Sequence, residues 1–204
     1  MKKVLFLIVS LSFFGTTAFA QDDEQVATIM SYVQTIYNDA QASVKKAQDK
    51  KPENRPESMI INVEKHMPGI GVQNKKIEIF YKGDWTENGD RMYYSSKVYF
   101  SRVSYNVASN PYNMEYLFNE DEKLIYYCGK WVDEDKVTNE VKCYLKDDTS
   151  VEMLQATDEY GKSNIDTKVY NISDGNSWQT MDAVRTGEEL IEAFSMMMIM
   201  GDRD

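Results

Sequence analysis

The sequence has 204 residues, of which 27% are charged, and its formal net charge is −10. Nucleic-acid binders show a basic patch, and the densest basic groups beyond the first 20 residues are the Lys-Lys pairs at 45–46, 50–51 and 75–76. This composition argues against nucleic acid and anionic membrane surfaces as partners. One histidine and two cysteines are too few for a multi-histidine or Cys₄ metal site.

The first 20 residues have the three parts of a secretory signal peptide. Lys2 and Lys3 precede an apolar run at 4–14, and Ala18-Phe19-Ala20 is a small-x-small cleavage site. The run is shorter than the about 20 residues that span a membrane. We therefore expect cleavage between Ala20 and Gln21, and a periplasmic or secreted mature protein. Loss of two lysines leaves 21 basic against 33 acidic residues, a charge of −12.

Residues 22–49 are predicted to form a helix, because their apolar residues recur at helical spacing. This stripe comprises Val26, Ile29, Met30, Val33, Ile36, Tyr37, Ala40, Val44 and Ala47. A loop with Pro52 and Pro56 follows.

From Met59 onward the period of the pattern changes to two, which is typical of strands. Strands are predicted at "MIINVEKH" and "KKIEIFYKG", and "DWTENGD" is interpreted as a turn-rich connection. In "RMYYSSKVYFSRVSYNV", Val98 and Phe100 have one parity, whereas Val103 and Tyr105 have the other. A β-bulge near Ser101-Arg102 would bring both sets to one face.

Further strands are predicted at 113–118, 123–132, 139–146 and 151–155, while residues 156–180 show no period. Thr186 and Glu189 match a capping box that would begin a C-terminal helix ending near Gly201. No later apolar stretch is long enough to span a membrane. The predicted fold is one α+β domain over residues 21–204, an antiparallel meander of six to seven strands with both helices packed on one face.

The two cysteines, Cys128 and Cys143, lie in neighbouring predicted strands. If the turn between them centres on Asp135 and Lys136, paired residues have numbers that sum to 271, and the cysteines are directly opposite. In an oxidising compartment such a pair can form a disulfide. A structural disulfide is the favoured interpretation, and buried free thiols are the alternative.

Other chemical groups give weak signals. His66 lies beside a turn with no nucleophile-elbow motif, so a role as a catalytic base is disfavoured. Acidic clusters at 119–122, 133–136 and 147–148 are expected to be solvated turns, with a weak calcium site as the alternative. The sequence predicts no metal centre, catalytic residue or cofactor, although paired carboxylates for glycoside hydrolysis are not excluded.

Aromatic residues supply the candidate binding site. The chain has 14 tyrosines. In the 271 register Tyr127 lies opposite Tyr144, on the same face as Trp131. An exposed aromatic face of this kind can bind a partner protein or a sugar ring. Cross-strand packing, or cover by residues 156–186, is the alternative.

The run from "NKKIEIFYKG" through "YLFNEDEKLIYY" to "VKCYLKDD" resembles uncharacterised small exported α+β proteins of Gram-negative gut bacteria. The resemblance covers roughly residues 63–154 and implies an exported α+β domain without an activity. A glycine usually follows the aspartate in such hairpins, and Glu122 occupies that position here. The position often requires a positive φ angle.

The leading hypothesis is therefore an exported, non-enzymatic binding or interaction domain of the cell envelope, with an envelope protein or a glycan as its partner. The alternatives are a carboxylate-dependent hydrolase and an inhibitor-like protein. A hydrolase should show a concave pocket with carboxylates, and a binding module an exposed aromatic patch. An inhibitor should show projecting, rigid turns such as "DWTENGD".

Overall fold

The computed structural model describes residues 19–68, 71–88, 91–107, 110–172 and 177–201. The predicted signal peptide lies almost entirely outside these residues. The first described element is helix α1 (Phe19–Lys45), which is followed by short 3₁₀ turns at Lys46–Gln48 and Pro52–Asn54. The predicted N-terminal helix is thus confirmed.

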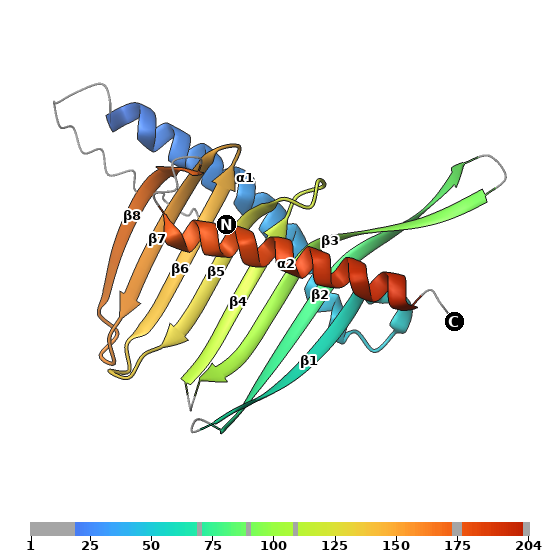
Figure 1. The fold of residues 1–204 in the computed structure, drawn as a ribbon. Helices are drawn as coiled ribbons and strands as arrows, with labels where there is room; N and C mark the ends of the chain where they lie inside the picture. Colours follow the sequence, from blue (N-terminus) through green and yellow to red (C-terminus); the bar gives the residue numbers. More distant parts are fainter. Residues whose placement is uncertain (1–18, 69–70, 89–90, 108–109, 173–176, 202–204) are drawn as a thin grey trace, which may run out of the picture.

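The centre of the fold is one antiparallel sheet in which eight strands follow each other in chain order (Figure 1). The strands are β1 (Glu57–Met67), β2 (Gly71–Asn88), β3 (Arg91–Val107), β4 (Asn110–Phe118), β5 (Leu124–Val132), β6 (Thr138–Lys146), β7 (Thr149–Thr157) and β8 (Ser163–Asn171). The α+β meander is confirmed, with more strands than predicted. The sequence analysis assigned no strand to β8, although Ile165, Thr167 and Val169 alternate with Asp166 and Lys168, because this edge strand is exposed on both faces and its alternating run is short.

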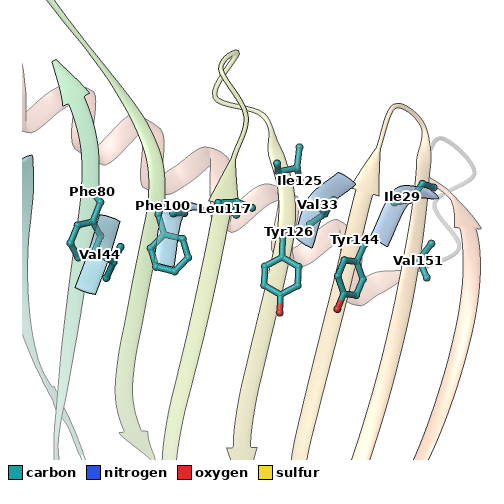
Figure 2. Packing of buried hydrophobic residues seen from close by; sticks show 11 residues of the cluster. Ile29, Val33, Val44, Phe80, Phe100, Leu117, Ile125, Tyr126, Tyr144 and Val151 are labelled. Atoms are coloured by element: carbon teal, nitrogen blue, oxygen red, sulfur yellow. The ribbon is translucent and has the colours of Figure 1, made fainter. Parts of the chain in front are cut away.

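The two helices pack on opposite faces of the sheet, so the prediction that both share one face is wrong (Figure 1). Helix α1 contributes Ile29 and Val33 to a core with Leu117 and Tyr126 (Figure 2). Helix α2 (Trp178–Gly201) contributes Leu190 and Phe194 to a second core, with Tyr116 and Phe118. Consecutive residues of β4 therefore serve different cores, and we name the two sides the α1 face and the α2 face.

Two bulges change the parity of the strands. Val98 pairs with Tyr81 and Phe100 with Phe80, so Tyr99 is the additional residue of the first bulge. Phe100 consequently joins the α1 core, while Val98 and Val103 both join the α2 core. The predicted bulge exists, but it lies at Tyr99 rather than at Ser101-Arg102. A second bulge adds Ile125 in β5.

The predicted disulfide is wrong, because the β5–β6 register differs by one residue from the expected one. Cys128 pairs with Lys142, and Cys143 pairs with Tyr127. A slip of one residue moves a side chain to the other face of a sheet. Cys128 therefore packs against the α1 core and Cys143 belongs to a cluster on the α2 face, and both thiols are free.

Helix α2 begins earlier than the predicted capping box. Ser177 is the cap: its Oγ accepts a hydrogen bond from Thr180 N at 3.1 Å, as an N-cap serine does. Thr186 lies two turns inside the helix instead. Gly201 is the last described residue of the helix, so the predicted stop lies at the limit of the described residues.

Within the described residues, neither helix combines the length and the apolar character that crossing a membrane requires.

Candidate functional site: a projecting hairpin arm

The three aromatic residues predicted as a binding site do not share a face. Tyr126, not Tyr127, pairs with Tyr144. Tyr144 is 6% exposed and belongs to the α1 core, whereas Tyr127 and Trp131 lie on the α2 face. The one-residue slip that separates the cysteines also separates these rings.

Tyr127 and Trp131 take part in aromatic packing on the α2 face. The Tyr127 ring covers the backbone of Gly129 and lies 5.3 Å from the Tyr116 ring. Burial raises the pKa of Tyr127, and the neighbouring Cys143 adds to this effect. Trp131 stacks on Tyr112 at 6.5 Å, with the planes 2° apart. Both side chains are partly buried.

A hollow of about 570 Å³ lies across β1–β4. Arg102 of β3 and Glu115 of β4 contact Gln41 and Tyr37 of α1, so their side chains lie on the α1 face. The strand register places most of the lining side chains on this same face, and the hollow therefore opens there. Its polar lining comprises Asn62, Glu64, Asn74, Lys75, Lys76, Ser104, Asn106 and Asn113. A hydrolase that uses paired carboxylates requires two of them, and this lining supplies one, Glu64.

The most prominent surface feature is the outer part of the β2–β3 hairpin, residues 82–88 and 91–97, which we name the arm. Beyond Tyr81 no residue of β2 pairs with β1, and before Phe100 no residue of β3 pairs with β4. The arm is therefore a two-stranded ribbon that extends beyond the sheet (Figure 1). Seven residues at about 3.4 Å each give it a reach of about 24 Å.

On the β1 side, the base of the arm is held by Glu57. One carboxylate oxygen accepts a hydrogen bond from Gly83 N at 2.6 Å, and the other accepts one from Tyr94 Oη at 2.8 Å. The Tyr94 ring crosses Gly83 so closely that a Cβ at this position would lie 1.8 Å from the phenol oxygen. A glycine is thus required for the tyrosine to reach the carboxylate.

On the other side, the β4–β5 turn holds the base. Glu122 Oε1 accepts a hydrogen bond from Val98 N at 2.8 Å, and Lys97 Nζ donates one to the carbonyl of Glu120 at 2.9 Å. Glu122 has a φ angle of 58°, the left-handed conformation expected at this position. A glycine would adopt this angle more easily, but it would lack the carboxylate that binds the arm.

Trp85 is the principal apolar group on the arm. It pairs directly with Tyr94, and the two rings are tilted by 53° with centroids 5.0 Å apart. Trp85 is nevertheless 62% exposed. The arm thus presents much of a large ring to solvent, while Tyr94 contacts this ring and Glu57 holds the base of the arm.

The remaining candidate groups have structural surroundings. His66 is exposed and lies 2.9 Å from Glu64. Burial raises the pKa of Cys128 to about 11 and that of Cys143 to about 12, with nearby carboxylates adding to both shifts. The acidic clusters do lie in turns between strands. Among the described residues, no grouping of His, Cys, Asp and Glu could hold a metal ion.

The sequence pattern did not identify Trp85 and Tyr94 as a site. "DWTENGD" is rich in turn-forming residues, yet Asp84–Asn88 continue the strand. The available signal was the length of the strand pattern beside this segment. The pattern at 91–107 is longer than the neighbouring predicted strand at 113–118, so part of it has no partner in the sheet. No family model, curated protein or solved structure matches the chain.

Proposed function

We propose that the protein is an exported, non-enzymatic interaction domain, and that the arm docks into a partner protein of the cell envelope with Trp85 as its anchor. The observation that carries this proposal is a tryptophan that is 62% exposed on a ribbon held from both sides of its base.

The energetics favour this use of the arm. An isolated two-stranded hairpin is marginally stable in water, so the bonds from Glu57 and Glu122 supply order that the ribbon lacks by itself. A docking element that is already ordered loses less entropy on binding. Tryptophan is enriched among the residues that dominate binding energy at interfaces.

The arm suits a protein partner better than a glycan. The Trp85 ring makes a tilted contact with the Tyr94 ring at 5.0 Å, so the arm offers a single aromatic wedge rather than a broad platform. Both outer edges of the ribbon lack a neighbouring strand over its described residues, so a partner strand can pair with either one. The charge of −12 expected after cleavage favours the long-range approach of a basic partner, while the arm itself carries both signs of charge.

The test combines cross-linking with a matched pair of tryptophan variants. A photoreactive residue replaces Glu87 on the arm, and the variant is expressed in the cells from which the protein comes. After illumination, the protein cross-linked to it in the cell envelope is identified and purified. Binding is then measured for Trp85→Ala and for Trp178→Ala. Trp178 is the control because it is also exposed, at 72%, but lies at the start of α2.

We expect Trp85→Ala to weaken binding by about thirtyfold, which corresponds to about 2 kcal/mol for an anchor residue. Trp178→Ala should leave the affinity within about twofold of the parent value. Equal affinities for Trp85→Ala and the parent protein would refute the proposal, as would equal losses in both variants.

The arm also favours the inhibitor-like alternative, because it is a projecting and braced segment. If the cross-linked partner is an enzyme, titration with the purified protein should reduce its turnover to near zero at one equivalent. Trp85→Ala should shift this titration to higher concentration. An enzyme partner with unchanged turnover would exclude inhibition while leaving the docking proposal intact.

A further inference from the structure

The last strand, β8, forms an open edge of the sheet. Among the strands that the structure describes, it is the terminal member of the order and pairs with β7 alone. All its residues are exposed except Tyr170, which is partly buried. Exposed edge strands present unpaired backbone groups and are templates for pairing with another chain.

The hydrogen bonds at both ends of β8 establish which of its residues present their backbone outward. Asp158 N donates to Lys162 O at 3.0 Å, and Ile172 N donates to Asp148 O at 2.7 Å. Backbone groups alternate in direction along an antiparallel strand. Even-numbered residues therefore bond to β7, and the outward donors and acceptors belong to Ile165, Thr167 and Val169.

The side chains of β8 form two different rows. Val169 pairs with Val151 of the α1 core, which places Ile165, Thr167 and Val169 on the α1 face. Ile165 and Val169 are 55% and 46% exposed. Asp166 and Lys168 lie on the α2 face and form an ion pair at 2.9 Å within the strand.

We propose that β8 is a homodimerisation strand, which pairs antiparallel with β8 of a second copy about a two-fold axis at Thr167. In this register Thr167 faces Thr167 of the second copy, and Ile165 faces Val169 of the second copy. Asp166 likewise faces Lys168 of the second copy. The sequence of the strand is therefore complementary to itself in both rows, and the two sheets join into one. This inference is independent of the proposed function of the arm.

The same register also satisfies the backbone. Outward-facing residues meet outward-facing residues, and each such pair exchanges two N–H···O=C bonds. The charged residues then occupy non-hydrogen-bonded pairs, where side chains approach most closely. Both the apolar pairs and the opposite-charge pairs stabilise an antiparallel contact.

Neighbouring registers lack this match. A two-fold axis at Asp166 places Asp166 against itself, and an axis at Lys168 places Lys168 against itself. Like charges directly opposite each other are destabilising. The Asp166–Lys168 pair thus disfavours the two neighbouring registers, and of the registers compared the axis at Thr167 alone places both opposite charges and the apolar residues against each other.

The first test is a charge-reversal series measured by sedimentation velocity over a wide concentration range. The parent protein should show a monomer–dimer equilibrium. Asp166→Lys should weaken dimerisation at least about tenfold, because two symmetric attractions become repulsions. The double variant Asp166→Lys with Lys168→Asp restores complementarity and should return the dissociation constant to within about threefold of the parent value.

The second test assigns the dimer to this edge. Thr167→Cys should form a disulfide-linked dimer on mild oxidation, because Cα atoms of a hydrogen-bonded pair lie about 5.5 Å apart. Asn164→Cys is the matched control: it is exposed on the same strand, but it faces Tyr170 of the second copy and should not cross-link.

Three results would overturn the proposal. They are a monomer at every concentration, a dimer that is indifferent to the charge series, and equal cross-linking at positions 164 and 167. Circular dichroism spectra of all variants establish that a lost dimer does not reflect a lost fold.

Discussion

At the scale of single residues, the pairing of Cys128 and Cys143 shows how much depends on one step of register. The apolar residues of the face expected to hold both cysteines are all in the sequence. The turn from Asp133 to Val137, however, pairs residues of β5 and β6 whose numbers sum to 270 instead of 271. Asp133 Oδ1 accepts hydrogen bonds from the backbone N–H groups of Asp135 and Val137. These bonds select the turn, and the sequence pattern alone does not show them.

The two thiols should stay unreactive in the folded protein. With a pKa of about 11, Cys128 has a thiolate fraction of about 10⁻³ at pH 8, so alkylation should be at least about a hundredfold slower than for an ordinary exposed thiol. Mass spectrometry after iodoacetamide pulses measures this rate, and Asn164→Cys provides the exposed reference. An intramolecular disulfide after oxidative folding would contradict the structure.

The same thiols predict alkaline sensitivity. Their pKa values are raised in the folded state, so their contribution to stability is complete below the unfolded value of about 8.5. The contribution is lost as the pH rises through about 11 to 12. The midpoint of urea unfolding should therefore be constant between pH 7 and 8 and fall above pH 9.

At the scale of elements, the arm depends on a small number of local choices. Gly83→Ala would force the Tyr94 ring away from Glu57, since the new Cβ would overlap the phenol. The far end of a flexible side chain can move, so the free energy of unfolding should change by less than about 1 kcal/mol. Hydrogen exchange of the arm amides should nevertheless become faster.

A double-mutant cycle with Tyr94→Ala tests this mechanism. In the Tyr94→Ala background Gly83→Ala has no ring to displace, so it should add little to the exchange rates, and the two changes should be strongly non-additive. Additive effects would show that Gly83 acts through its own backbone instead of through the tyrosine.

The sequence predicts most elements of this fold because their periodicity is strong. Helix α1, the hairpins of β4 to β7 and the end of α2 follow from apolar spacing and turn residues. Besides the β5–β6 register, the start of α2 and the face on which each helix packs, three features do not follow. The bulge at Tyr99 moves Phe100 to the other core, β8 is exposed on both faces, and the arm continues through a segment rich in turn-forming residues.

At the scale of the whole molecule, the sheet is buried by one helix on each side, so a strand such as β4 has apolar residues of both parities at its end. Tyr116, Leu117 and Phe118 are each at most 2% exposed. A sheet covered on one face would show alternation. The uninterrupted run at the end of β4 was the sequence signal for two helical layers, and a search for a single apolar face misses it.

One buried carboxylate holds the start of α2 against its face of the sheet. Glu152 of β7 is 1% exposed, and its Oε1 accepts hydrogen bonds from Thr180 Oγ1 at 2.5 Å, from Thr180 N at 3.2 Å and from Ser177 Oγ. These donors belong to the first turn of α2, where a carboxylate also meets the positive end of the helix dipole. Glu152 therefore links the start of α2 to β7, whereas the arm extends from β2 and β3, near the other end of the strand order.

Glu152→Ala should destabilise the protein by about 2 kcal/mol, because it leaves buried donors without an acceptor. Glu152→Gln retains an oxygen in the same place and should cost less, which separates the role of the acceptor from that of side-chain volume. Urea unfolding measures both values. Hydrogen exchange should increase in the first turns of α2 and remain unchanged in α1, since α1 packs on the opposite face. Equal destabilisation by the two substitutions would show that an acceptor oxygen alone does not hold the start of α2. Loosening of both helices together would show that the helices do not depend on separate faces of the sheet.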